Sequence, residues 1–313
     1  MNQHFDMICI GMALVDSIIK GFDPVPVSAS GYRAVSSSLN VGGEAVNEAI
    51  AAARLGMKTA ILCALGRDAA GDMVKSALSG SGVDTGLILY PEAHSTPVTT
   101  MFVQDDGTRQ SITNTAHRFN FHPEKDCSRF TCARALLLGS LFRAPFDDPE
   151  IIQAVLRAAS QAGQLIFADT KLPNFRALTL ADIRDSLSLM DYITPNEDEA
   201  RYYSGKEEPE DMADVFLDAG VRNVIIKLGG RGCFFKNADT TLSLPPYPVK
   251  AVDATGAGDN FIAGFASEIL RGSSPCDAIR FANACGAICT TAVGAGAALQ
   301  SRAQVLAFMN EIQ

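Results

Sequence analysis

The chain has 313 residues, which is enough for one large α/β domain or two small ones with a sizeable hydrophobic core. Its formal net charge is −9 and no local cluster of Lys and Arg is found, which argues against nucleic acid or an anionic membrane as a partner. No apolar run is long enough to span a bilayer, and the N-terminus lacks the pattern of a secretory signal. The eight cysteines form no Cys-x-x-Cys pair, so we expect a cytoplasmic protein with free, buried thiols.

Strand and helix patterns alternate along most of the chain. The predicted strands cover residues 7–10, 58–64, 135–138, 164–168, 191–193 and 223–227, followed by a hairpin at 232–244. The predicted helices begin at Glu44 and cover 70–79, 148–162, 197–203 and 209–219, with three more beginning at Gly256, Pro275 and Ser301. This alternation predicts a three-layer α/β/α fold with a mainly parallel sheet, and the absence of a low-complexity linker favours a single domain over residues 1–313.

Two stretches, residues 14–39 and 96–112, interrupt the alternation. Both are rich in strand-forming residues and contain turn residues, with no helical pattern between the strands. Within the second, an Asp-Gly pair at 106–107 separates two strand patterns, which predicts a hairpin. From the sequence pattern alone, these strands fit a plain surface hairpin as well as a small sheet that covers a site.

The segment 252–261, Val-Asp-Ala-Thr-Gly-Ala-Gly-Asp-Asn-Phe, predicts an anion-binding helix start. Gly256 and Gly258 let the backbone turn sharply around Ala257 and present N–H groups at a helix N-terminus, where phosphate is favoured. A carboxylate beside a phosphate site is useful if it takes a proton from an attacking hydroxyl, so Asp259 is the candidate general base. The structural alternative is an acidic residue in the first turn of a Gly-capped helix.

A second glycine-rich segment precedes the helix at Glu44, and with it the chain resembles the ribokinase-like, or PfkB, family of carbohydrate kinases. That family combines an N-terminal Gly-Gly segment and a following Asn with a C-terminal Asp-x-Thr-Gly-Ala-Gly-Asp. Here these are Gly42, Gly43 and Asn47 near the N-terminus and residues 253–259 near the C-terminus, in the expected order. The resemblance extends over essentially the whole chain.

The resemblance implies an ATP-dependent sugar kinase in which the γ-phosphate of Mg-ATP is transferred to a hydroxyl of a small carbohydrate. It implies that the strands at 14–39 and 96–112 form a β-sheet lid over the sugar. The residues that it assigns to the substrate are Asp16, Gly42, Gly43, Asn47 and Asp259, with Gly256, Ala257 and Gly258 as the anion hole. Since an exposed strand edge invites pairing, a homodimer through the lid strands is a further expectation.

The same resemblance assigns the nucleotide and metal sites. Asn196 and Glu199 match an Asn-x-x-Glu motif that organises Mg²⁺ through water, although their spacing also fits a helix capping box. Lys227, Gly229 and Gly232 match nucleotide-binding positions but also form a plausible hairpin turn, and Asn283 falls where the family lines the adenine pocket. Asp253 and Thr255 match part of a K⁺ site found in many relatives.

The acceptor remains open at this stage. Ser140 and Asp169 agree in part with fructokinase-type relatives, while Lys171 is either a partner for an anionic group or a solvated loop lysine. A ribose- or fructose-like sugar is favoured because no basic cluster for a second phosphate is evident. Nucleosides such as adenosine, inosine and pseudouridine, 2-keto-3-deoxygluconate, and a non-catalytic sugar-sensing role are the alternatives. Asp259 and Glu199, which a sensor would be free to lose, are both present.

Overall fold

The computed structural model describes residues 4–21, 34–104, 109–114 and 120–311. Its main sheet has eight strands in the order β12-β11-β10-β9-β8-β7-β1-β4. In chain order these strands are β1 (Phe5–Ile10), β4 (Thr59–Leu62), β7 (Ala133–Leu141), β8 (Leu165–Thr170), β9 (Tyr192–Ile193), β10 (Asn223–Lys227), β11 (Cys233–Asn237) and β12 (Thr241–Leu244). Neighbouring strands from β10 across to β4 pair in parallel, whereas β11 pairs antiparallel with both β10 and β12.

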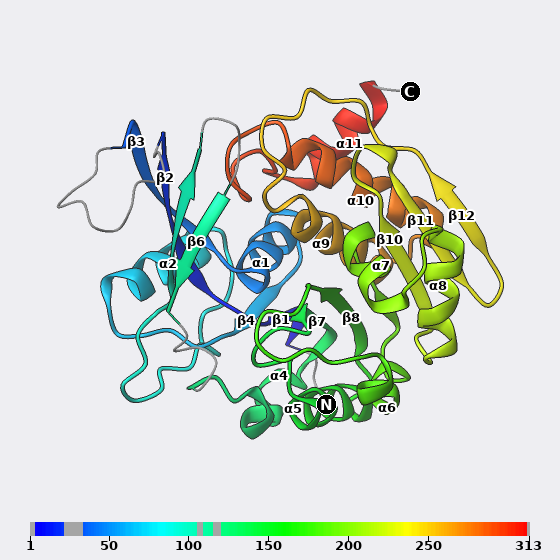
Figure 1. The fold of residues 1–313 in the computed structure, drawn as a ribbon, viewed down its shortest axis with the longest axis horizontal. Coiled ribbons are helices and arrows are strands. Elements are labelled where there is room, and N and C mark those ends of the chain that lie inside the picture. Colours follow the sequence, from blue (N-terminus) through cyan, green and yellow to red (C-terminus); the bar gives the residue numbers. More distant parts are fainter. Residues whose placement is uncertain (1–3, 22–33, 105–108, 115–119, 312–313) are drawn as a thin grey trace.

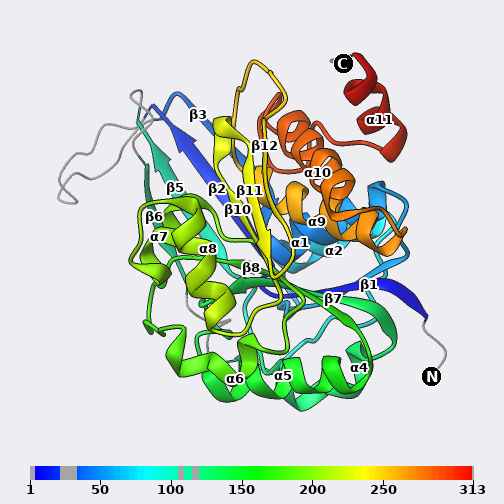
Figure 2. The same ribbon diagram turned by 90° about the vertical axis from the view of Figure 1, so that its right-hand side faces the viewer.

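Helices cover both faces of this sheet (Figures 1 and 2). On one face lie α1 (Glu44–Arg54), α2 (Ala69–Gly80), α9 (Ala257–Leu270), α10 (Pro275–Cys289) and α11 (Arg302–Glu311). On the other lie α4 (Cys127–Phe130), α5 (Pro149–Gln161), α6 (Arg184–Leu187), α7 (Glu197–Ser204) and α8 (Pro209–Asp218). Both faces of the sheet are apolar and must be covered. In strand β1, for example, Met7 and Cys9 pack in one hydrophobic core, whereas Ile8 and Ile10 pack in the other.

The predicted three-layer α/β/α architecture is confirmed, and most element boundaries agree within a few residues. The segments that the periodicity missed are short: α4 and α6 have four residues each. The 3₁₀ turns at Pro123–Asp126, Ala181–Ile183 and Gly229–Arg231 are also brief. A helix of about one turn is too short to show a hydrophobic repeat.

The two interrupting stretches form a separate four-stranded sheet in the order β3-β2-β5-β6. Its strands are β2 (Leu14–Lys20), β3 (Ser36–Gly42), β5 (Val98–Val103) and β6 (Arg109–Thr113). Strand β2 pairs in parallel with β5, which joins the two stretches, and this small sheet projects to one side of the molecule in Figure 1. The predicted turn at 106–107 and residues 22–33 of the first stretch lie outside the described residues.

All eight cysteines are free, as predicted, but only five are buried; Cys127, Cys132 and Cys276 are half-buried. Within the described part of the chain, no helix has both the length and the apolar character needed to cross a membrane. The prediction of a cytoplasmic location is not tested by these observations.

Candidate active site

The candidate residues converge where the parallel strands end and where helices α1 and α9 begin. Gly43 caps α1 with φ 99° and Gly256 caps α9 with φ 77°, so both helices start from the left-handed backbone region that favours glycine. A Cβ at Gly43 would collide with the carbonyl oxygen of Met12, and one at Gly256 would collide with Ala295. Packing between α1 and α9 then brings the two glycine-rich segments together (Figure 1).

Asn47 and Asp259 make direct contact in this arrangement. The Asn47 Nδ2 atom donates a hydrogen bond of 2.7 Å to Oδ2 of Asp259. Asp259 lies in the first turn of α9 and is 5% exposed, so this bond fixes its carboxylate on the inner side of the helix start. Two residues that the sequence assigned to one site are therefore adjacent in space.

The Asp259 carboxylate is in an environment suited to a base. Burial raises its pKa from the ordinary value to about 6; the positive charge of Lys171 opposes this rise, whereas the carboxylates of Glu44 and Asp169 contribute to it. The hydrogen bond from Asn47 also favours the ionised form. A pKa near 6 leaves Asp259 ionised at neutral pH but able to hold a proton briefly.

The segment predicted to bind an anion lies at the start of helix α9, where its glycines predicted a helix start. After Gly256, helix α9 begins at Ala257, whose N–H donates to the Ala254 carbonyl oxygen at 3.2 Å, whereas the N–H groups of Gly258 and Asp259 have no intrahelical acceptor. A Cβ on Gly258 would lie 3.1 Å from the ammonium nitrogen of Lys227, which places that cation beside the helix start. The helix dipole and the ammonium together favour an anion here.

Lys227 is also part of a contact that the sequence did not reveal. Its Nζ atom donates to Oδ1 of Asp169 at 2.5 Å, and the Thr194 hydroxyl donates to the same oxygen at 2.9 Å. Lys227 was expected to reach an ATP phosphate, but its ammonium group already pairs with the buried Asp169 carboxylate. Its place beside Gly258 keeps it within the anion-binding region.

Asp16 enters the site from the small sheet. It lies on β2, where strand β3 pairs alongside and brings Gly42 close, and a Cβ on Gly42 would collide with Asp16 Oδ2. Burial, followed by the charge of Glu44, raises the Asp16 pKa to about 6. The carboxyl group can accept hydrogen bonds from hydroxyls of a ligand held between the two sheets.

Asn196 and Glu199 form the capping box that was the structural alternative for their spacing. The backbone N–H of Glu199 donates to Asn196 Oδ1, and that of Asn196 donates to Glu199 Oε2, both at 2.9 Å. The Thr170 hydroxyl at the end of β8 donates to the same Oε2 at 2.8 Å. Because both bonds to the Glu199 carboxylate go to Oε2, its Oε1 atom is left among the described residues to accept from a metal-bound water, so the two roles are compatible.

The other nucleotide-site candidates differ in their surroundings. Gly229 has φ 57° and no heavy atom within 4 Å of a Cβ built on it, so its outer side is open to a ligand. Gly232, at φ 89°, is needed for the turn itself, since a Cβ there would collide with the Leu244 carbonyl oxygen. Asn283 on α10 is buried and donates to the Pro245 carbonyl oxygen at 3.1 Å, which is a structural contact.

Asp253 joins two segments near the start of α9. Its Oδ1 accepts from the backbone N–H and the hydroxyl of Thr255, at 3.0 and 2.7 Å, and its Oδ2 accepts from the backbone N–H of Gly294 at 3.0 Å. This brings the 253–256 loop against residues 294–296, and carbonyl oxygens of both segments are of the chemical type that binds hard cations.

Two acidic residues of α1 were missed by the sequence analysis. Glu48 is fully buried, and neither of its carboxyl oxygens has a hydrogen-bond partner among the described residues. Oxygens of Glu48, Asp169 and Asp259 all lie within 4.8 Å of one another, and burial followed by the charge of Asp259 raises the Glu48 pKa well above its ordinary value. Glu44 pairs with Lys171 at 3.5 Å. The available signal was spacing, since Asn47 and Glu48 follow Glu44 by three and four positions and so lie next to it on the helix surface.

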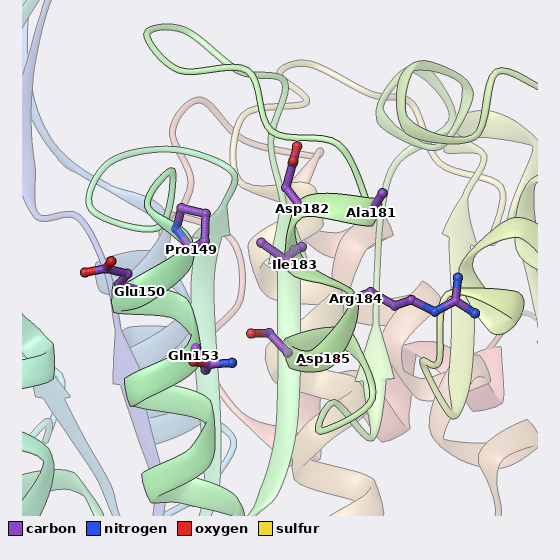
Figure 3. Close-up of a pocket in the computed structure, with 9 residues that line it drawn as sticks. Pro149, Glu150, Gln153, Ala181, Asp182, Ile183, Arg184 and Asp185 are labelled. Atoms are coloured by element: carbon purple, nitrogen blue, oxygen red, sulfur yellow. The ribbon is translucent and has the colours of Figure 1, made fainter.

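A cavity of about 230 Å³ lies elsewhere, between α5 and residues 181–186 (Figure 3). Its lining includes Glu150, Gln153 and Asp185, and none of the candidate site residues borders it. It therefore does not compete with the site at the strand ends.

Comparison with known proteins agrees with this geometry. The model of the pfkB family carbohydrate kinases matches residues 7–302. The chain is 31% identical over 273 residues to ribokinase of Haemophilus influenzae, covering 86% of this chain and 87% of that protein, and 28% identical over 323 residues to fructokinase-1 of Oryza sativa, covering 97% of each. The structure of Arabidopsis thaliana ribokinase complexed with ribose and ATP matches with a TM-score of 0.87, at 25% identity, over 99% of both chains.

The fold and the site thus define a carbohydrate kinase: the chain belongs to the pfkB family. It is an enzyme of the class that transfers phosphate to a hydroxyl acceptor. The resemblance identified from the two glycine-rich segments is confirmed.

Proposed function

We propose that this protein is an ATP-dependent kinase that phosphorylates a hydroxyl of a ribose- or fructose-like sugar, with Asp259 as general base. The observation that carries the proposal is the buried Asp259 carboxylate, held by Asn47 in the first turn of the glycine-capped helix α9. Base and anion hole thus belong to one helix start, so an acceptor hydroxyl and a γ-phosphate bound there are adjacent.

In this reaction the Asp259 carboxylate accepts the proton of the acceptor O–H. The acceptor oxygen forms the new bond to the γ-phosphorus, the bond from that phosphorus to the β,γ-bridging oxygen breaks, and the electron pair leaves with ADP. The backbone N–H group of Gly258, in the first turn of α9, stabilises the negative charge on the transferring phosphoryl group. Asp16 and Asn47 orient the acceptor from the side of the small sheet.

The nucleotide lies along the Asn196, Lys227 and Gly229 side of the site in this proposal. The oxygen donors of Asn196 and Glu199 suit a hard cation that keeps most of its waters, so they fit Mg²⁺. When bound, Mg²⁺ supplies charge neutralisation on the β- and γ-phosphates. Asp253 and Thr255, tied to Gly294, are proposed to hold K⁺ beside the anion hole.

The small sheet of β2, β3, β5 and β6 is proposed to act as a lid on the acceptor. Asp16 on β2 couples this sheet to the substrate, and closure over the sugar would exclude water and limit ATP hydrolysis. Its edge strands β3 and β6 present the exposed side chains of Leu39 and Ile112, which supports a homodimer through the lid edges. Size-exclusion chromatography with light scattering tests this, because a monomer at micromolar concentration would remove the proposal.

An ADP-release assay with Mg-ATP tests the function directly. We expect one strongly preferred acceptor among ribose, fructose, 2-keto-3-deoxygluconate, adenosine, inosine, pseudouridine and fructose 1-phosphate, and higher turnover in K⁺ than in Na⁺. A nucleoside or 2-keto-3-deoxygluconate as the preferred acceptor would replace the ribose- or fructose-like assignment. ATP binding without turnover on any acceptor would favour a sugar-sensing protein.

A further inference from the structure

Lys171 stands directly after β8 on a backbone that is held firmly in place. Its N–H donates to the Leu141 carbonyl oxygen at 3.0 Å, and its own carbonyl oxygen accepts from the Tyr203 hydroxyl at 2.7 Å. The Tyr203 ring stacks on Phe142 with a centroid separation of 4.0 Å. The side chain of Lys171 therefore extends from a rigid base at the carboxyl edge of the sheet.

The ammonium group of Lys171 is surrounded by carboxylates from separate elements. Its ion-pair partner is Glu44 on α1, and its charge also acts on Asp259 of α9, Asp169 of β8 and Glu199 of α7. Burial alone would lower the pKa of Lys171, but these carboxylates raise it well above the ordinary value, so the side chain stays positively charged.

The two lysines of the site are held to different degrees. Lys227 is 13% exposed and donates to Asp169 at 2.5 Å. Lys171 is 27% exposed, and its 3.5 Å separation from Glu44 is longer than the roughly 2.7–2.9 Å of a charge-assisted hydrogen bond. Lys171 is therefore the cation that can change partner when an anion enters.

The position of Lys171 indicates which anion its ammonium group would bind. Asp259 marks the acceptor end of the reaction and Glu199 the metal and nucleotide end, and the Lys171 charge acts on both. The γ-phosphoryl group passes between these two ends during transfer. The surrounding carboxylates of Asp16, Glu44, Asp169, Glu199 and Asp259 outnumber the two lysines, so a phosphate needs nearby positive charge to bind.

We propose that Lys171 is a catalytic residue whose ammonium group leaves Glu44 and binds the oxygens of the transferring γ-phosphoryl group. This rests on the proposed kinase function and adds a residue to it. This contact strengthens as charge develops on the phosphoryl group. ADP has no γ-phosphoryl group, so it cannot make the contact. Glu44 is the resting partner that holds Lys171 in place when the nucleotide is absent.

The test compares the binding of Mg-ADP and of the Mg complex of the β,γ-imido analogue of ATP by calorimetry, which requires no knowledge of the acceptor. The variants are Lys171→Met and Lys171→Arg, with Lys125→Met, an exposed lysine outside the site, as the matched control. We expect wild type and Lys125→Met to bind the ATP analogue more tightly than ADP. Lys171→Met should lose at least about tenfold of this preference, as for removal of a charged hydrogen bond, and Lys171→Arg should keep part of it.

An unchanged preference in Lys171→Met would overturn the assignment while leaving the kinase function in place. Failure of the wild type to bind either nucleotide would overturn the kinase function itself. A second variant covers the case in which Lys171→Met does not fold. Glu44→Gln removes the carboxylate that pairs with the Lys171 ammonium group. The binding preference of this variant for the ATP analogue over ADP should therefore be greater than that of the wild type, and a smaller preference would count against the proposal.

Discussion

The Nδ2 atom of Asn47 donates a 2.7 Å hydrogen bond to Oδ2 of Asp259 across 212 positions of sequence. The bond links the second turn of α1 to the first turn of α9 and so sets the orientation of the proposed base relative to the anion hole. Asn47→Ala should lower kcat by about tenfold or more, since a misoriented base loses much of its effect, with little change in the KM for ATP. Equal kcat values for variant and wild type would show that Asp259 is held in place by packing alone.

Asp259→Asn should keep nucleotide binding and reduce phosphoryl transfer by at least about a hundredfold, because the amide cannot accept the acceptor proton. Single-turnover measurement of ADP formation, with nucleotide affinity measured separately, distinguishes chemistry from binding. Asp185→Asn, at the remote cavity of Figure 3, is the matched control and should behave as wild type. Near-normal turnover of Asp259→Asn would remove Asp259 from its proposed role.

The pH dependence of kcat/KM should show an acid limb near pH 6. Asp259 has its pKa raised to about 6 and must be ionised to act as a base, so activity falls as the pH decreases through that value. In Lys171→Met the limb should move to higher pH, because the Lys171 charge holds the Asp259 pKa down. A profile that stays flat down to about pH 5 would contradict this assignment of the base.

Glu48→Gln should stabilise the protein increasingly as the pH rises. The folded-state pKa of Glu48 is raised, so its contribution to stability is fully present below the unfolded pKa and is lost as the pH rises toward the folded value. Glutamine has the same shape and no charge to bury. The difference in Tm between variant and wild type should therefore grow between about pH 5 and pH 8. A difference that shrinks over this range would mean that Glu48 is ionised in the folded protein.

Gly256→Ala should be far more damaging than Gly272→Ala. Both glycines adopt positive φ at the ends of α9, at 77° and 88°. At Gly272 no heavy atom lies within 4 Å of an added Cβ, so the cost is backbone strain of about 1 kcal/mol, whereas at Gly256 the Cβ also collides with Ala295. Chemical denaturation and nucleotide affinity together check this, and similar losses in the two variants would show that the collision is relieved easily.

The sequence alone determined the fold class and indicated where along the chain the candidate site residues lie. Alternating periodicity predicted the three-layer architecture, and the glycines at 42, 43, 256 and 258 predicted two helix starts, which the structure has at Glu44 and Ala257. These features are local, because turn geometry and helix caps depend on a few neighbouring residues. Asn196 and Glu199 were likewise recognisable, since a capping box is encoded within four residues.

Only the tertiary structure decided which charges face one another. Strands and helices far apart in sequence meet at one sheet edge. Their meeting pairs Lys227 with Asp169 and Lys171 with Glu44, and it leaves the Glu48 carboxyl group without a hydrogen-bond partner among the described residues. Burial there raises the pKa of Asp16, Glu48 and Asp259, and no local sequence pattern predicts these shifts. The candidate site residues are thus recognisable from local sequence, whereas their partners and the shifts of their pKa values follow from the packing of α1 and α9 against the strand ends.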